Sequence, residues 1–515
     1  MHFSRSSKRF FDDDGLHDVI DNVAAQRSLV IYAGAGVTID RTGLSWPALV
    51  EKLLGKRKPL PVADAIMKTN TPLQAASIAS QLYADRSTGW ETHLVNEIRA
   101  LLYEGRDWQQ GGLARAVVSL AAELVDHGKT FHLATTNYDE FIQQEMELLN
   151  LGRKDLGASR VDVPVSVIET RHANPDFHLP DHTRPGQILH LHGYVPKEGG
   201  AQHATVVLSE RDYMVAYKRS SAVLEELFEQ HSVVILGSSL IDPPLLNALA
   251  ATMPAPGEDR LRVAVVPLQG MGFPDVADAT IEDVKSSVAD RMKSFGVQAV
   301  IPDFYYQVAQ LVTEVKVRVR RTAATSTTLP SRPYRERLGT WWTFWHGARK
   351  GDFEARQQTD HDLLSQALGR IRATLGVPRD ELMKLEIWVR WDPVKTGRLR
   401  LWASTASLWR NVEMMRSAEI VADSAYESVR AFCAGRPVIF PGDDDAREGR
   451  SDRWHTYLCV PVRLDEQSGD LPVAVISLAS MKVKPKSKIN EDNGAHISKV
   501  VSTEMKTVAR LIVSG

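Results

Sequence analysis

Polar side chains that could perform proton transfer follow two apolar segments of the sequence. Asn137 and Asp139 come directly after residues 131–136, and His192 follows residues 187–191. In open α/β sheets, ligands bind beyond the carboxyl ends of the parallel strands, so these side chains are placed for chemistry or ribose contacts at one crevice. A purely structural alternative is that Asn137 closes a turn and Asp139 caps the next helix.

The segment 187–194 is predicted to be a strand that ends in a glycine turn, and it contains two histidines. Residues two apart on a strand share a face, so His190 and His192 are expected side by side. Such a pair can hold a metal ion, but no third ligand is evident nearby in the sequence, so we predict no metal site. His192 suits a general base, whereas His190 better fits a hydrogen-bonded core histidine.

A glycine-rich turn is the second candidate site. The apolar run that begins at Leu29 is typical of a buried parallel strand, and it breaks into Gly34 and Gly36 before reaching Thr38. Glycines allow bare backbone to approach a ligand, and N–H groups at the start of a following helix attract phosphate. The pattern indicates a phosphate-binding turn, and a plain turn is the alternative.

Residues 233–242 repeat this arrangement. Four apolar residues predict another buried strand, and Gly237, Ser238 and Ser239 follow it before Asp242. The hydroxyl groups and the carboxylate are expected at the same edge of the sheet as the other strand ends.

Strands and helices alternate from residue 16 to about residue 317. This alternation predicts a doubly wound α/β domain with a parallel sheet over residues 1–318. Between about residues 47 and 126 only helical patterns occur. We therefore expect a helical insertion that forms a lid or one wall of a cleft.

Composition excludes several classes of protein. A chain of 515 residues indicates two to four domains, and a formal net charge of −2 provides no general attraction to nucleic acid or to acidic membranes. The two cysteines, Cys433 and Cys459, cannot build a disulfide framework or a four-thiolate zinc site. No apolar run is long enough for a membrane span or a signal peptide, so we expect a cytoplasmic protein without a nucleic-acid or membrane partner.

The composition changes near Arg318. Residues 320–333 contain few apolar side chains, so we predict an interdomain linker over residues 319–340, with its basic residues as a solvated hinge. The helical and strand patterns that follow predict a smaller α+β domain over residues 341–515.

Four motifs resemble, in this order, the NAD-binding motifs of the SIR2 superfamily: Gly34-Ala35-Gly36-Val37-Thr38, Thr135-Thr136-Asn137-Tyr138-Asp139, His192-Gly193 and Gly237-Ser238-Ser239-Leu240-Ile241-Asp242-Pro243. The resemblance implies that NAD+ is bound as a substrate and that no metal is needed. By position, Asn137 would hold the nicotinamide ribose or the attacking water, Asp139 would orient the nicotinamide and His192 would be the base. The residues that the resemblance assigns to NAD binding are Gly34, Ala35, Gly36, Thr38, Trp46, Thr136, Gly237, Ser238, Ser239 and Asp242.

Within this superfamily, the sequence is more similar to the SIR2-like domains of bacterial antiphage defence proteins, which hydrolyse NAD, than to protein deacetylases. A deacetylase normally carries a four-cysteine zinc module, and residues 1–318 contain no cysteine. The deacetylase segment Gly-Ile-Pro-Asp-Phe-Arg is replaced here by Gly43-Leu44-Ser45-Trp46.

The C-terminal part resembles a GAF domain over residues 353–515. The motifs are Ala434-Gly435-Arg436-Pro437-Val438, Cys459-Val460-Pro461-Val462 and Ala474-Val475-Ile476-Ser477-Leu478-Ala479-Ser480. GAF domains bind small molecules or dimerise, so the resemblance implies a sensor or oligomerisation domain.

Together, the resemblances imply an NAD+ hydrolase that depletes NAD in abortive infection once an event at the C-terminal domain releases it. The expected partners are an activating nucleotide, a phage protein or a co-encoded protein, and further copies of the chain in a homo-oligomer. Two alternatives stay open: an NAD-dependent deacylase or ADP-ribosyltransferase, and a non-catalytic NAD-binding regulator.

Overall fold

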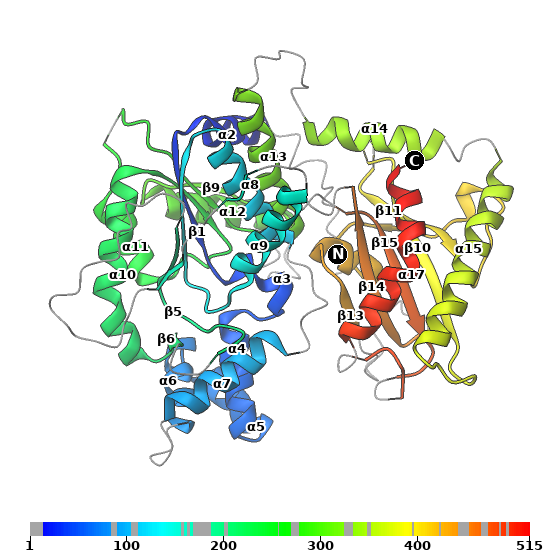
Figure 1. Cartoon of the computed structure of the whole chain (residues 1–515), viewed down its shortest axis with the longest axis horizontal. Helices are drawn as coiled ribbons and strands as arrows, with labels where there is room; N and C mark the ends of the chain where they lie inside the picture. The colour runs from blue at the N-terminus through cyan, green and yellow to red at the C-terminus, as the bar shows by residue number, and fades with distance from the viewer. Residues whose placement is uncertain are drawn as a thin grey trace.

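The structure is a computed structural model of the 515-residue chain. The residues that it describes are 14–83, 90–104, 112–155, 159–161, 165–167, 187–199, 204–255, 257–268, 278–323, 333–347, 352–393, 396–421, 424–440, 453–464, 472–483, 486–490 and 494–514. Figure 1 shows two bodies side by side, each built around its own sheet.

A seven-stranded sheet forms the centre of the N-terminal body. Its strands are β1 (Ser28–Ala33), β2 (Thr130–Thr135), β3 (Val165–Val167), β4 (Ile188–His190), β7 (Ser232–Leu236), β8 (Arg262–Val265) and β9 (Gln298–Val300). They lie in the order β3-β4-β2-β1-β7-β8-β9, and all neighbours pair in parallel. The predicted α/β class with a parallel sheet is confirmed.

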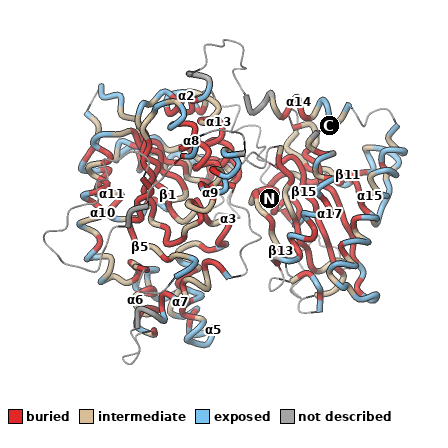
Figure 2. The backbone as a smooth tube through the Cα atoms, viewed as in Figure 1, coloured by how far each residue is buried: buried red, intermediate tan, exposed pale blue. Residues whose placement is uncertain are grey.

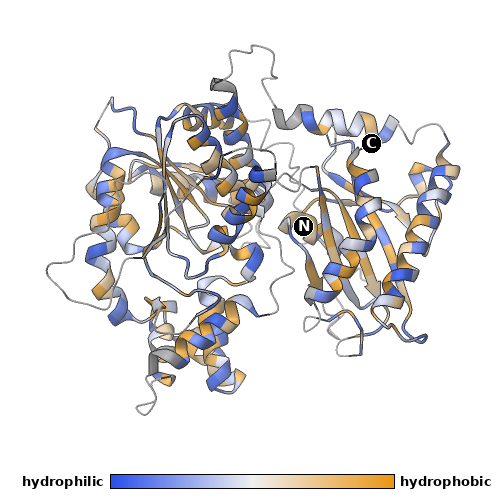
Figure 3. Ribbon diagram, in the orientation of Figure 1, coloured by the Kyte–Doolittle hydropathy of each residue, from blue (hydrophilic) through white to orange (hydrophobic). Residues whose placement is uncertain are grey.

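Helices cover both faces of this sheet because its strands present apolar side chains to both sides. Leu29 and Ile31 of β1 join the core on the face of α2, α8 and α13, whereas Val30 and Tyr32 join the core on the face of α10 and α11. Figure 2 shows the strands buried, and Figure 3 shows them as the most hydrophobic part of the body. The helices are α2 (Asp14–Ala25), α8 (Gly112–Asp126), α9 (Phe141–Asp155), α10 (Glu210–Gln230), α11 (Pro243–Ala251), α12 (Asp278–Lys293) and α13 (Tyr305–Ala323).

The chain between β1 and β2 is helical throughout its described residues. It contains the 3-10 turn η1 (Ala35–Val37) and the helices α3 (Ile39–Thr42), α4 (Trp46–Arg57), α5 (Leu60–Thr69), α6 (Pro72–Leu82), α7 (Trp90–Tyr103) and α8. The helices α4 to α7 build a separate core that also includes Tyr138, Phe141 and Val195. Because α8 instead shares the core of α2 and α13, the last helix of this stretch belongs to the sheet rather than to a lid.

A six-stranded antiparallel sheet forms the C-terminal body, in the order β12-β11-β10-β15-β14-β13. Its strands are β10 (Met383–Trp391), β11 (Arg398–Ser404), β12 (Ser417–Glu419), β13 (Val438–Phe440), β14 (Thr456–Arg463) and β15 (Pro472–Ser480). The other elements are α14 (Pro333–Gly347), α15 (Phe353–Thr374), η4 (Val412–Met414), α16 (Glu427–Ala434) and α17 (Gly494–Ser514). An α+β arrangement results, and its likeness to a GAF domain stays a prediction.

The ends of the segment predicted as a linker are helical. Helix α13 continues to Ala323 and α14 begins at Pro333, so only residues 324–332 of the predicted linker lie outside the described residues. Near the end of α13, the largely exposed guanidinium of Arg320 donates two hydrogen bonds to the carboxylate of Glu123, at 2.9 and 2.6 Å.

The two bodies contact each other through side chains of α13 and α16. The rings of Tyr306 and Phe432 meet edge to face, with centroids 5.5 Å apart, and one apolar cluster continues from the parallel sheet into the antiparallel one. Among the described residues, every helix is too short or too polar to cross a membrane.

Candidate functional site

The glycine-rich turn packs directly against the end of β7. The Gly34 N–H donates to the Leu236 carbonyl at 2.9 Å, and the Gly36 N–H donates to the Gly237 carbonyl at 2.8 Å. A Cβ atom on Gly34 would lie 2.5 Å from the Gly237 oxygen, so only glycine permits this approach. These N–H groups are therefore occupied within the chain, which differs from the expectation that they point outward to a phosphate.

Thr38 ties this turn to the end of β2. Its buried hydroxyl accepts a hydrogen bond from Asn137 Nδ2 at 3.0 Å and donates one to Asp139 Oδ2 at 2.8 Å. The structure thus brings together three of the residues predicted from separate motifs. The chain order alone does not place them in contact, but β1 and β2 are neighbours in the sheet.

Asn137 carries a buried acceptor that is not used within the described residues. The residue is 5% exposed, and its Oδ1 atom has no hydrogen-bond partner there. The backbone of Asn137 is fixed, because its N–H donates to Thr135 Oγ1 at 3.1 Å and its carbonyl lies 2.9 Å from His190 Nδ1. A buried acceptor without a donor is costly, so Oδ1 is suited to a ligand hydroxyl or a water molecule.

Asp139 both caps a helix and contributes a buried carboxyl group to the candidate site. Its Oδ1 accepts from the Phe141 N–H at 3.2 Å at the start of α9, as a capping residue does. Burial raises the pKa of Asp139 to about 6, although the Thr38 hydroxyl and Arg41 oppose that shift. Burial thus makes the Asp139 carboxyl easier to protonate than an exposed aspartate.

His192 lies in a bend after β4 rather than on a strand. The expectation that His190 and His192 share the face of one strand is wrong, because β4 ends at His190 and the chain then turns into the short strand β5 (Gly193–Tyr194). Gly193 has φ of +100°, and β5 pairs with β6 (Thr205–Val206), whose Thr205 carbonyl would be 2.2 Å from a Cβ on Gly193.

The imidazole of His192 faces Asp242. Its Nε2 atom lies 3.5 Å from Asp242 Oδ1, and both residues are nearly buried. Burial lowers the pKa of His192, and the Asp242 carboxylate opposes that shift. A neutral imidazole beside a carboxylate can accept a proton and be stabilised as the imidazolium.

Two tyrosines that the sequence did not single out complete this group. The hydroxyl of Tyr32 donates to Asp242 Oδ2 at 2.7 Å, and the hydroxyl of Tyr213 donates to Asp242 Oδ1. The ring of Tyr213 also meets the His192 ring edge to face, with centroids 5.0 Å apart. The only sequence signal for Tyr32 was a single polar group within the apolar run of β1, two residues before the glycine turn.

The remaining predicted residues lie around these two groups. Asp242 lies beside His192, while Ser238 Oγ accepts from the Leu240 N–H at 3.1 Å and Ser239 adjoins it in the same turn. The Thr136 N–H donates to the Ala33 carbonyl at 3.2 Å, next to the glycine turn that contains Ala35. Trp46 starts α4 and packs against the core of the helical insertion.

His190 has the structural role that was predicted for it. Its ring is fully buried, and its Nε2 atom lies 2.6 Å from Gln143 Nε2 while its Nδ1 atom lies near the Asn137 carbonyl. Burial lowers the pKa of His190 to about 4. Among the described residues, no group of three or more His, Cys, Asp or Glu side chains is arranged to hold a metal ion.

The raised pKa of Asp139 predicts a pH-dependent stability. A folded-state pKa of about 6 against an ordinary value of 3.8 means that the folded chain binds this proton more tightly. The contribution to stability is therefore full below pH 3.8 and is lost as the pH rises through about 6. Urea unfolding of the Asp139→Asn variant should show a weaker fall in stability across this range than the parent chain.

An exposed carboxylate provides the control. The hydrogen bond from Lys482 lowers the pKa of Asp380, so ionisation of Asp380 raises the stability of the folded chain as the pH rises. Asp380→Asn should therefore remove a pH dependence of opposite sign to that of Asp139. An unchanged pH profile for Asp139→Asn would contradict the raised pKa.

Comparison with known proteins identifies the central part of this body. Residues 132–285 match a family model described as a SIR2-like domain, and this range includes Asn137, Asp139, His192 and Asp242. Among solved structures, the crystal structure of a SIR2 homolog–NAD complex matches 60% of this chain and 94% of that chain, with 12% identity and a TM-score of 0.29. A search of curated proteins finds no match. The family match therefore shows that residues 132–285 are similar to a SIR2-like domain.

Proposed function

We propose that this protein is an NAD+ hydrolase that cleaves the bond between nicotinamide and ribose, releasing nicotinamide and ADP-ribose. Two findings support the proposal. Residues 132–285 match a SIR2-like domain, and the tips of β1, β2, β4 and β7 bring an amide, two carboxylates and an imidazole to one edge of the sheet.

The unpartnered Oδ1 of Asn137 is the observation on which the proposal rests. An unsatisfied buried acceptor costs about 1 to 3 kcal/mol, and a bound ribose hydroxyl or water would remove that cost. The Asn137 amide is oriented for this by Thr38, which accepts from its Nδ2 atom. Asn137 thus acts as a fixed acceptor for substrate or nucleophile.

The other residues have distinct roles in the proposed reaction. As the C1′–nicotinamide bond breaks, the ribose gains oxocarbenium character, and water forms the new C1′–O bond. His192 accepts the proton of that water, and Asp242 stabilises the resulting imidazolium. The Asp139 carboxyl, beside Thr38, helps to orient the nicotinamide end.

The C-terminal body is proposed to regulate this activity. Because uncontrolled NAD+ hydrolysis would harm the host cell, we infer a low resting activity that is released through the GAF-like domain by a nucleotide, a phage protein or a co-encoded protein. A homo-oligomer would transmit that signal between copies. The proposed setting is abortive-infection defence in the cytoplasm.

The test is NAD+ turnover by the purified chain, with and without extract from infected cells, with the products identified. Release of nicotinamide and ADP-ribose without any acceptor supports the proposal. Nicotinamide release that requires an acylated peptide or another acceptor would identify a deacylase or transferase. NAD+ that binds and stays intact under every activating condition would identify a regulator.

A matched pair of variants tests the site itself. Asn137→Ala removes the fixed acceptor and should leave a folded chain with little turnover. Asn150→Ala is the control, because it removes another buried amide, in the C-terminal half of α9, whose side chain bonds the backbone of Val161. It should change stability without silencing the reaction. Full NAD+ cleavage by Asn137→Ala would refute its role.

A further inference from the structure

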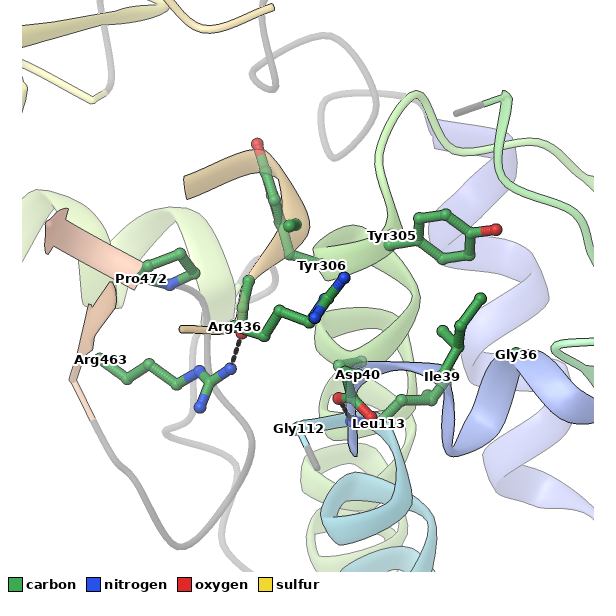
Figure 4. Close-up of a pocket in the computed structure, with 13 residues that line it drawn as sticks. Gly36, Ile39, Asp40, Gly112, Leu113, Tyr305, Tyr306, Arg436, Arg463 and Pro472 are labelled. Atoms are coloured by element: carbon green, nitrogen blue, oxygen red, sulfur yellow. Dashed lines mark hydrogen bonds between the residues drawn. The ribbon is translucent and has the colours of Figure 1, made fainter. Parts of the chain in front are cut away.

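A cavity of about 140 Å³ lies between the N-terminal and C-terminal bodies. Its polar lining consists of Asp40 from α3, Tyr305 and Tyr306 from α13, and Arg436 and Arg463 from the C-terminal body. Figure 4 shows Arg436 reaching toward Asp40 and Tyr305. The cavity therefore presents guanidinium donors from one body and a carboxylate acceptor from the other.

The Asp40 carboxyl is built for a ligand that donates a hydrogen bond. The residue is 8% exposed, its Oδ2 accepts from the Leu113 N–H at 3.2 Å, and its Oδ1 has no partner among the described residues. Burial raises the pKa of Asp40 to about 6, and Arg463 and Arg436 oppose the shift. The Asp40 carboxyl thus lines the cavity, and its Oδ1 atom is buried without a donor among the described residues.

Arg436 is held in place by its neighbours. Gly435 has φ of +62° at the end of α16, and a Cβ there would lie 2.9 Å from Tyr306 Cβ, so the turn sits close against α13. Arg463 donates to the Gly435 carbonyl and fixes the same turn. Burial lowers the pKa of Arg436, while the Asp40 carboxylate opposes this shift.

The volume of this cavity matches that of a single aromatic ring. A cavity of about 150 Å³ holds benzene, so the volume here accommodates one six-membered ring. Tyrosine side chains and the apolar Ile39 and Leu113 line it, and bases bind to proteins by stacking on aromatic rings. A carboxylate accepts from the exocyclic amino group of cytosine, and arginine donates to ring nitrogen and carbonyl acceptors of bases.

We propose that this cavity binds a cytosine base, in a nucleoside or a nucleotide, with its N4 amino group on the Asp40 carboxylate and its O2/N3 edge on Arg436. Uracil has the same shape but carries an oxygen at position 4, which would face the Asp40 oxygen without a proton between them. The cavity thus discriminates between two isosteric rings.

Helix α3 connects the cavity to the candidate site, so a ligand in the cavity can affect the position of Thr38. Asp40 lies two residues after Thr38, which binds Asn137 and Asp139, and next to Arg41, which donates to Glu145 at 2.9 Å. Any ligand that draws on Asp40 acts on the four-residue helix that positions Thr38. That the ligand would regulate NAD+ cleavage rests on the proposed function, whereas its binding does not.

The experiment is calorimetric titration of the full chain with cytidine and with uridine, in the absence of NAD+. Cytidine should bind more tightly than uridine by about five- to one-hundredfold. Arg436→Met should abolish cytidine binding, while Arg370→Met, a matched change at an exposed ion pair with Glu504, should not. Asp40→Asn should weaken cytidine binding and reduce the preference over uridine, because the amide keeps a single acceptor oxygen, which the Leu113 N–H already uses.

Each result decides the proposal independently of catalysis. No binding of either nucleoside, equal binding of both, or cytidine binding that survives Arg436→Met would overturn it. Cytidine binding that is lost in Asn137→Ala but kept in Arg436→Met would place the nucleoside at the candidate NAD site and would also overturn it. A failure of NAD+ turnover would leave these binding results unaffected.

Discussion

Replacing His192 with Ala should lower the rate of NAD+ cleavage by on the order of 100- to 10,000-fold, measured under conditions in which the parent chain turns over. The reason is that the imidazole is the proposed base, with Asp242 Oδ1 3.5 Å from its Nε2 atom. The loss should appear mainly in kcat, because the residue acts on the transition state rather than on NAD+ binding.

Two further variants make this result specific. His93→Ala changes an exposed histidine of α7 and should leave the rate unchanged. Asp242→Asn keeps a partner of similar shape but removes the charge that stabilises the imidazolium, and it should also lower the rate. Turnover by His192→Ala at the parent rate would show that another group is the base.

Replacing Gly237 with Ala should destabilise the N-terminal body and impair the site at the same time. Gly237 has φ of +63°, which costs an alanine about 1 to 2 kcal/mol. Its Cβ would also lie 2.4 Å from the Val37 nitrogen, and overpacking of this kind costs about 1 to 3 kcal/mol more. Thermal unfolding should show the loss of stability, and a binding titration should show weakened affinity for NAD+.

Gly128 provides the matched control. It has a similar φ of +66°, but a Cβ there would meet nothing within 4 Å. Gly128→Ala therefore has the cost of a positive φ but no steric clash of the new Cβ. The difference in stability loss between the two variants measures the contribution of the close approach between the strand ends. Equal effects of both substitutions would contradict the importance of that approach.

The sequence predicted the sheet and the ends of its strands because both depend on local patterns. Apolar runs followed by glycine or by polar residues mark buried parallel strands, and the rule that ligands bind at their carboxyl ends placed Asn137, Asp139 and Thr38 in one region. Their direct hydrogen bonds through Thr38 agree with that expectation.

Other parts of the site depend on contacts that local patterns do not encode. Tyr32 and Tyr213 reach Asp242 from a strand and a helix elsewhere in the chain, 210 and 29 residues away. The bend that carries His192 off its strand follows from the pairing of β5 with β6. Such tertiary contacts determine how these side chains are oriented, and the hydrophobic periodicity of the sequence does not encode that orientation.

The role of the glycine turn shows the same limit. Its residues were predicted to present N–H groups to a phosphate, but the N–H groups of Gly34 and Gly36 donate to carbonyls at the end of β7. The choice between a ligand and another strand end depends on which segment lies opposite, and that segment is distant in the sequence. The same applies to Arg320, whose partner Glu123 is distant in the sequence.

The interlocking of Gly34, Gly36 and Gly237 also bears on synthesis of the protein. The turn after β1 emerges from the ribosome early, but the backbone it locks against is translated much later. A nascent chain that has not yet passed Gly237 lacks this partner, so it cannot assemble the complete crevice. The proposed NAD+ cleavage would therefore stay silent until Gly237 has been translated.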